Sequence, residues 1–329
     1  MEFQGKPIRI GKKMIILGIA ALSIILPLGL TACGTDAVTP PQTTDSAVFP
    51  MTITDDAGRT VTIAKQPEKI VSLIPSHTEN LFALGVGNKV VGVDDFSDYP
   101  PAALDKPKMG NLFSVNYEAI VSAVPDLVLV DISAVGMGVV DQLTNVLGNT
   151  PVVVIKGTSV SSFQEVYDSI GLMGKIVGAP EKAEQIVSDM KARVKAVTDK
   201  TSGLTAAQKP RTVYIIWPEP MYIHGSNGLG SALIVAAGGL NIFIDNTGDA
   251  VQLEELVSRN PQIILASASE SMGDFAYQFA LTDSRLDTTE AKINGAIYGM
   301  NDDFTARPGP RLVEGLESMA KLLHPELFG

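Results

Sequence analysis

Residues 115–130 read VNYEAIVSAVPDLVLV, and residues 251–266 read VQLEELVSRNPQIILA, so the two stretches align without a gap 136 positions apart. In each copy a helical pattern is followed by a proline turn and then by an apolar run typical of a buried strand. Glu118 matches Glu254, and Pro125 matches Pro261. Any two helix–turn–strand units share some features, but the common register favours two lobes of related topology.

The sequence around both copies alternates short apolar runs with helical patterns. We expect a short hairpin over 52–62 and strands at 69–74, 89–93, 126–130, 151–155, 213–217, 262–266 and 296–300. Helices are expected at 78–84, 117–123, 139–147, 229–237, 253–259 and 310–323. This alternation indicates βαβ units and largely parallel sheets.

The middle of the chain is helical throughout. A helix over 162–177 is followed by a break at 178–180. Pro180 suits the first turn of a second helix, which continues from Glu181 to about Lys200 without glycine or proline. A helix of that length spans about 30 Å, enough to bridge two lobes. The predicted fold is therefore α/β, with two Rossmann-like lobes of mainly parallel sheets joined by one long helix. The lobes are expected at 51–160 and 209–329, with the helical linker at 161–208.

The first 50 residues have a different composition. Four basic residues, Lys6, Arg9, Lys12 and Lys13, precede an apolar run over 14–29, and small residues then lead into Cys33, the only cysteine. These are the parts of a secretory signal, predicted over 1–32. Leu30-Thr-Ala-Cys33 resembles the lipobox of bacterial lipoproteins. That resemblance implies an acylated Cys33, a flexible tether over 33–50, and a protein anchored outside the cytoplasm on the cell membrane. An uncleaved spanning helix and a chance cysteine after an ordinary signal peptide are the alternatives.

Composition and motifs exclude several classes of function. The formal net charge of −11 argues against nucleic acid as a partner. An acylated Cys33 leaves no thiol for a disulfide, a redox pair or a metal. No Gly-x-Ser-x-Gly, phosphate loop or HExxH motif occurs, and His77, His224 and His324 are far apart in the sequence. A glycine-rich turn over 225–230 is weak evidence for a nucleotide. We therefore predict no catalytic residue, no metal site and no cofactor.

The loops that follow the predicted strands carry much of the chain's aromatic content. In open parallel sheets, ligands bind beyond the carboxyl ends of the strands. The aromatic residues at or near these ends are Phe96, Tyr99, Phe113, Trp217, Tyr222 and Phe304. Because aromatic side chains line ligand clefts, we expect a small-molecule site there, although each ring could instead pack beneath its own loop.

Residues from about 52 to 326 resemble a class III periplasmic substrate-binding protein of an ABC importer, the group that carries vitamin B12, ferric siderophores and haem. The matching stretches are KIVSLIPS (69–76), TENLFALG (78–85), VGV (91–93), SDYPP (97–101), NYE (116–118), PDLV (125–128) and PR (310–311). The resemblance implies a monomer that holds its ligand between two lobes and works with an ABC permease and its ATPase. It also implies that Glu118 and Glu254, one per lobe, dock onto arginines of the permease. The alternative interpretation is that both are ordinary glutamates, which the helix dipole favours in the first turn of a helix.

Within this group, SDYPP preceded by Phe96 is most similar to the vitamin B12 binders. The resemblance implies corrinoid contacts at Phe96, Leu112, Asp131, Ile216, Gly248 and Asp303, with Phe113, Trp217 and Phe304 adjacent to them. Pro75, Ser76 and Tyr222, in strand-end loops, complete the predicted ligand site. Leu112, Asp131 and Gly248 depart from the family pattern, in which several of these positions are aromatic, and this leaves open either the exact corrinoid or the exact alignment.

The expected function is capture of cobalamin or a related corrinoid and its delivery to the permease. A ferric siderophore or haem is the alternative ligand. Few basic residues occur near the strand ends, Lys108 and Arg307 among them, which favours a nearly neutral ligand over an anionic one. An exported lipoprotein enzyme and a purely structural lipoprotein are the alternatives from other classes.

Overall fold

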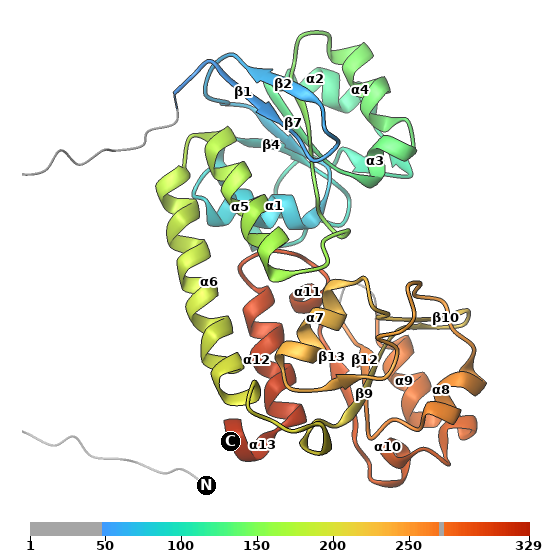
Figure 1. Cartoon of the computed structure of the whole chain (residues 1–329). Helices are drawn as coiled ribbons and strands as arrows, with labels where there is room; N and C mark the ends of the chain where they lie inside the picture. Colours follow the sequence, from blue (N-terminus) through green and yellow to red (C-terminus); the bar gives the residue numbers. More distant parts are fainter. Residues whose placement is uncertain (1–47, 270–272) are drawn as a thin grey trace, which may run out of the picture. The chain divides into compact units, whose positions relative to one another are not determined.

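A computed structural model describes residues 48–269 and 273–329 (Figure 1). The predicted signal peptide over 1–32, the lipidation site Cys33 and most of the tether over 33–50 lie outside these residues. Within the described ranges, no helix combines the length and the apolar character needed to cross a membrane.

The N-terminal lobe is built on a four-stranded sheet with the order β4-β3-β7-β8, in which every pairing is parallel. Its strands are β3 (Ile70–Ser72), β4 (Val90–Val93), β7 (Leu127–Asp131) and β8 (Val152–Ile155). Its helices are α1 (Pro75–Ala83), α2 (Tyr117–Ala123), α3 (Ser133–Gly136), α4 (Val139–Leu147) and α5 (Phe163–Val177). Two antiparallel hairpins accompany the sheet, β1 (Met51–Thr54) with β2 (Thr60–Ile63), and β5 (Gly110–Asn111) with β6 (Ser114–Val115). The hairpin predicted over 52–62 is confirmed.

The C-terminal lobe has the strand order β10-β9-β12-β13, with β11 also paired to β9. Its strands are β9 (Arg211–Pro218), β10 (Met221–Ile223), β11 (Leu240–Asn241), β12 (Ile263–Ser267) and β13 (Ile297–Met300). Its helices are α7 (Leu229–Ala236), α8 (Leu253–Arg259), α9 (Phe275–Thr282), α10 (Glu290–Ile293), α11 (Asp302–Thr305), α12 (Leu312–Leu323) and α13 (Pro325–Phe328). Of these strands, β10 pairs antiparallel and the rest pair parallel. The predicted fold of two α/β lobes with mainly parallel sheets is therefore confirmed.

The sequence repeat is a structural repeat with the same residue offset. Helices α2 and α8 both have seven residues, and each is followed by a residue in the left-handed conformation, Val124 at φ 48° and Asn260 at φ 47°. Strands β7 and β12 then start at equivalent positions, and each lies between two parallel neighbours. Alternate residues of each strand enter different hydrophobic clusters, as a strand buried on both faces requires.

The left-handed position in the repeat gives a prediction about stability. A β-branched residue is strained there by about 1–2 kcal/mol, whereas asparagine adopts this conformation more readily. Since 66% of Val124 is exposed, Val124→Asn loses little burial and should raise the free energy of unfolding by about 1 kcal/mol. Asn260→Val should lower it by about 2 kcal/mol, because Asn260 Oδ1 also accepts a hydrogen bond from Glu290 N at 2.8 Å. Urea denaturation measures both, and a destabilised Val124→Asn protein would contradict this account.

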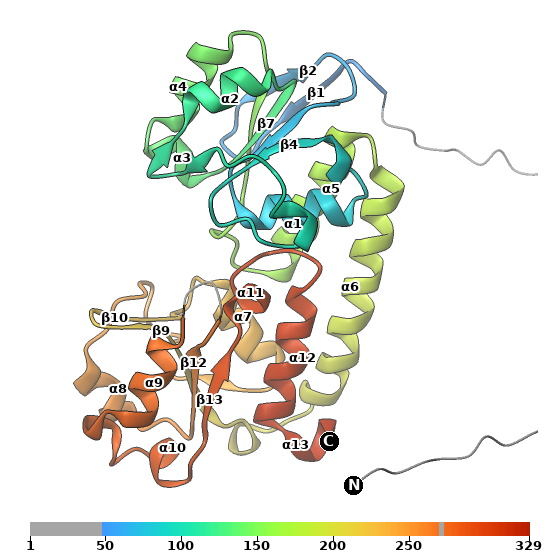
Figure 2. The same cartoon turned by 180° about the vertical axis from the view of Figure 1, so that it is seen from behind.

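Helix α6 (Pro180–Thr201) is the predicted long helix, and its 22 residues contact elements of both lobes. It lies beside α5 and α12 in both views (Figures 1 and 2). One hydrophobic cluster runs from Leu81 of α1 through Met190 and Val197 of α6 to Leu316 of α12. The two lobes therefore share a buried core through α6, rather than being linked only by a tether.

Two predicted helices begin elsewhere. Helix α1 begins at Pro75 instead of 78, because proline is favourable at the first helical position. Helix α12 begins at Leu312 instead of 310. Helix α1 is also unusual in burying five consecutive polar residues, 76–80, which places polar groups at the end of the sheet where the lobes meet.

Candidate functional site

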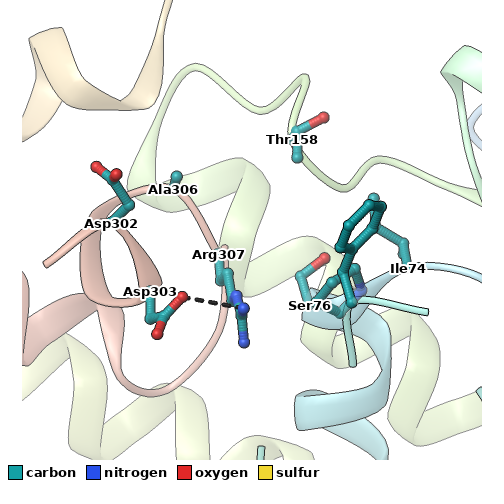
Figure 3. A pocket seen from close by; sticks show the side chains of 9 residues that line it. Ile74, Ser76, Thr158, Asp302, Asp303, Ala306 and Arg307 are labelled. Atoms are coloured by element: carbon teal, nitrogen blue, oxygen red, sulfur yellow. Dashed lines mark ion pairs between the residues drawn. The ribbon is translucent and has the colours of Figure 1, made fainter. Parts of the chain in front are cut away.

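A pocket of about 180 Å³ lies between the loops of the two lobes (Figure 3). Its lining residues are Ile74, Pro75, Ser76, Phe96, Thr158, Asp302, Asp303, Ala306 and Arg307. The first five follow the carboxyl ends of β3, β4 and β8, and the last four follow β13. The pocket is thus at the strand ends, where ligands bind in open parallel sheets.

The start of helix α1 forms one wall of the pocket. Ile74 is the N-cap and makes no side-chain cap, so the first backbone N–H groups of the helix have no partner within the helix. Ser76 is 2% exposed, and its hydroxyl has no hydrogen-bond partner in the described part of the chain. This wall therefore presents hydrogen-bond donors, and an acceptor on a ligand would satisfy them.

The loop that carries Phe96 is held by a buried polar network. The Ser97 hydroxyl contacts the Asp94 carboxylate and lies 2.8 Å from Thr78 Oγ1, and Lys108 Nζ donates to the backbone carbonyl of Ser97 at 2.7 Å. Burial raises the pKa of Asp94, although the hydrogen bond from Ser97 acts in the opposite direction. With its loop fixed in this way, Phe96 is 60% exposed and offers an apolar surface at the pocket.

The opposite wall combines two carboxylates with one arginine. Asp302 accepts a hydrogen bond from the Tyr214 hydroxyl at 3.0 Å, and burial raises its pKa. Arg307 Nη2 lies 3.0 Å from Asp303 Oδ1, an ion pair drawn in Figure 3. Burial disfavours the charge on Arg307, but hydrogen bonds to Asp98 and Glu79 outweigh it and raise the pKa above its usual value. The arginine beside the pocket is therefore already paired with carboxylates.

Asp131 lies behind the pocket wall. It is fully buried, and its carboxylate accepts hydrogen bonds from the backbone N–H groups of Gly157 at 2.7 Å and Ser133 at 2.9 Å. A side chain at position 157 would collide with that carboxylate. Asp131 thus holds the loop that presents Thr158 to the pocket, and its own oxygens do not line it.

The structure brings four predicted ligand residues together at the pocket: Pro75, Ser76, Phe96 and Asp303. A second group lies at the end of β9 and on β10, where Tyr222 is opposite Trp217 in register and Ile216 precedes it. Four others do not line the pocket: Leu112 and the 89% exposed Phe113 between β5 and β6, Phe304, which follows Asp303 in α11, and the exposed Gly248, two residues before Ala250, which pairs with Tyr222.

Six further residues at these surfaces were not predicted as ligand contacts, and Ile74, Asp302 and Ala306 of the pocket lining are three of them. Thr158 and Arg307 line the pocket, and Phe275 is 62% exposed with its ring centre 5.7 Å from that of Trp217. Thr158 follows the strand predicted at 151–155, so the same strand-end rule would have identified it. Phe275 begins a short helix that no sequence pattern indicated.

The glycine-rich turn over 225–230 has a packing explanation. A side chain at Gly230 would overlap the His224 ring, and one at Gly225 would meet the backbone of Gly248. These glycines allow the turn to pack closely, so they need no nucleotide to explain them. Within residues 48–269 and 273–329, no group of three or more histidine, cysteine, aspartate or glutamate side chains could hold a metal ion.

Glu118 and Glu254 have equivalent surroundings in the two lobes. Each is exposed and lies in the first turn of its helix, α2 or α8. Among the hydrogen bonds and ion pairs of the described residues, none involves either carboxylate. Both charges are therefore free to interact with another molecule.

Two α/β lobes around a strand-end pocket are the architecture of a substrate-binding protein. Residues 70–304 match the periplasmic binding protein family, and this chain belongs to that family. It is accordingly the substrate-binding protein of an ABC importer, as the resemblance over 52–326 implied.

The chain is similar to several known proteins. It is 32% identical to the uncharacterized ABC transporter substrate-binding lipoprotein YvrC of Bacillus subtilis, over 94% of this chain and 98% of the relative. It is 29% identical to a cobalamin-binding protein of Halobacterium salinarum, over 84% of this chain and 74% of the relative. Among solved structures, a possible iron-binding periplasmic solute-binding protein of Staphylococcus epidermidis is 27% identical, with a TM-score of 0.67. The alignment covers 79% of this chain and 100% of that protein's chain.

Proposed function

We propose that this protein is a lipid-anchored receptor that captures cobalamin or a related corrinoid between its two lobes and delivers it to an ABC permease. Cys33 carries the anchor, and Glu118 and Glu254 dock onto the permease. The protein acts as a monomer and has no catalytic role. The observation that carries the choice of ligand is the charge balance at the pocket.

The basic groups around the pocket are already engaged. Arg307 is paired with Glu79, Asp98 and Asp303, and Lys108 donates to the backbone carbonyls of Asp94 and Ser97. The carboxylates of Asp302 and Asp303 also line the pocket. An anionic siderophore, or haem with its carboxylates, would meet these negative charges without an uncommitted cation in the pocket lining. Such burial of unpaired charge is unfavourable, so a nearly neutral ligand is the better match.

The polar groups of the two walls also suit an amide. The Ser76 hydroxyl and the start of α1 can donate to a carbonyl oxygen, and the carboxylates of α11 can accept from an amide NH₂. Corrinoids carry several carboxamide side arms around an otherwise apolar ring. At about 180 Å³, the pocket is smaller than the roughly 300–1,000 Å³ of whole-ligand pockets. It therefore fits a side arm, while the exposed Phe96 covers part of the ring.

Binding of purified protein to candidate ligands tests this proposal. The chain from residue 33, with Cys33→Ser to prevent acylation, is mixed with cyanocobalamin, cobinamide, haemin or a ferric catecholate siderophore. We expect a corrinoid to stabilise the fold by about 2.7 kcal/mol at a hundredfold excess over Kd. Phe96→Ala should weaken binding about tenfold or more, whereas Ile293→Ala, an exposed change on α10, should not. Stabilisation by haemin or the siderophore, with none by either corrinoid, would establish the alternative ligand instead.

A further inference from the structure

A carboxylate of one lobe is buried against two arginines of the other. The Glu79 side chain, on α1, is 4% exposed. Arg307 Nη1 lies 3.0 Å from Glu79 Oε1, and Arg311 reaches the two oxygens of Glu79 with Nε at 2.9 Å and Nη2 at 2.6 Å. We call Glu79, Arg307 and Arg311 the interlobe ion cluster.

Both arginines contact side chains of each lobe. Arg307 pairs with Asp98 of the N-terminal lobe at 2.5 Å as well as with Asp303 of its own lobe. The guanidinium carbon of Arg311 lies 3.7 Å from the ring centre of Tyr99 and 5.1 Å from that of Phe304. The guanidinium of Arg311 is thus in contact range of one aromatic ring from each lobe, in addition to Glu79.

The backbone between the two arginines packs closely against α1. Asn80 Nδ2 donates to the carbonyl of Pro308 at 3.1 Å. A side chain at Gly309 would come within 3.0 Å of Asn80 Oδ1. The segment 307–311 therefore has a close-packed contact with the N-terminal lobe, besides its ion pairs.

We infer that Glu79 is the positioning residue that fixes the spacing of the two lobes and hence the width of the ligand pocket. Arg307 is itself a pocket wall, and the loop that presents Phe96 to the pocket continues directly into Asp98 and Tyr99. The contacts that join the lobes and the contacts offered to a ligand are therefore made by the same two segments. Without the charge on Glu79, Arg307 still has Asp98 and Asp303, but the largely covered guanidinium of Arg311 loses the carboxylate that it contacts through Nε and Nη2. Separation of the lobes is then the way to hydrate Arg311.

A distance measurement on the ligand-free protein tests this inference. The chain from residue 33 with Cys33→Ser contains no cysteine, so Ser122→Cys and Ser258→Cys introduce one label in each lobe. Both serines are exposed and lie at equivalent positions of the repeat, on α2 and α8. Pulsed electron spin resonance between two spin labels should give a narrow distance distribution for the parent and a longer or broader one for Glu79→Gln.

Glu317→Gln is the matched control. Glu317 also holds an arginine, Arg193, through two hydrogen bonds at 2.9 and 2.8 Å, but its side chain is 36% exposed and it joins α12 to α6. Its distance distribution should match the parent's. Arg311→Lys keeps the charge but loses the paired hydrogen bonds and the ring stacking, so it should also broaden the distance distribution. This variant replaces Glu79→Gln in the test if Glu79→Gln does not fold. An unchanged distribution in a folded Glu79→Gln or Arg311→Lys protein would overturn the inference.

The expected effect of Glu79→Gln on ligand affinity rests on the proposed function, so it is measured separately from the distances. Loss of the preformed pocket should weaken cyanocobalamin binding by Glu79→Gln about tenfold. If the parent itself does not bind cyanocobalamin while the distances change as expected, the proposed ligand is wrong and the role of Glu79 stands. If the parent binds and Glu79→Gln binds equally well, Glu79 does not set the width of the pocket.

Discussion

Replacing Glu118 and Glu254 together by lysine is expected to reduce ligand uptake by cells at least about 100-fold while ligand affinity stays unchanged. Both carboxylates are exposed in the first turn of equivalent helices, one in each lobe. If they meet arginines of the permease, reversal puts like charges together, and such contacts cost several kcal/mol. Neither residue lines the pocket, so corrinoid binding by the purified double variant should equal that of the parent. The measurements are transport of labelled cobalamin and its binding in solution.

A matched control separates docking from general effects of charge. Asp141→Lys with Glu181→Lys makes the same change in net charge, also at exposed acidic residues in the first turns of two helices, α4 and α6. Its loss of favourable interaction with the helix dipole is therefore similar, and its transport should remain near that of the parent. Normal uptake by the Glu118→Lys/Glu254→Lys variant would show that these residues do not dock onto the permease.

Acidification is expected to destabilise the fold strongly through His77. Burial lowers the pKa of His77 from 6.5 to about 4, although the charge of Asp131 acts in the opposite direction. Between these two values the unfolded chain binds a proton and the folded chain does not. The contribution of His77 to the free energy of unfolding is therefore greatest above pH 6.5 and decreases as the pH falls. The expected loss is about 2 kcal/mol at pH 5 and about 3 kcal/mol once the pH is below 4. His224, whose pKa burial also lowers to about 4, adds to the loss.

The variant His77→Leu isolates this contribution. The backbone carbonyl of Lys156, which interacts with the His77 ring, also accepts a hydrogen bond from Ser169 Oγ at 3.3 Å. Leucine therefore leaves that carbonyl with a partner and should be nearly neutral at pH 7.5. Between pH 7.5 and 5, the variant should lose about 2 kcal/mol less than the parent in urea denaturation. Burial raises the pKa values of Asp94 and Asp302, so these two groups favour the folded state on acidification. Their contribution is the same in parent and variant, and it cancels in the comparison. Equal losses in parent and variant would contradict the role of His77.

Much of the fold could be predicted because its signals are local and repeated. The sequence repeat with an offset of 136 residues predicted a helix, a turn and a central strand in each lobe, and the structure has these elements at the same offset. The long helix was predictable because about twenty residues lack glycine and proline. Short elements were missed: α9, α10, α11 and α13 have four to eight residues each. At that length packing against the rest of the lobe, rather than periodicity, determines the conformation.

The candidate site was only partly predictable from the sequence. Strand-end reasoning indicated Ser76, Phe96 and Asp303, which line the pocket. Asp131 is the last residue of β7, yet its carboxylate accepts a hydrogen bond from the Gly157 backbone and does not line the pocket. Which way a side chain points at a strand end depends on which unpaired backbone groups lie beside it, and those come from segments distant in sequence.

The sequence by itself determined the class of fold, the two related lobes, the connecting helix and the region of the pocket, because each depends on patterns within a few turns of chain. Only the tertiary structure decided the relation between the lobes. Glu79 and Arg311 are 232 residues apart, and nothing in either segment indicates that their charges are buried together. Whether an arginine is free for a ligand or already paired depends on its surroundings in space. That distinction decides the charge of the ligand that the pocket can accept.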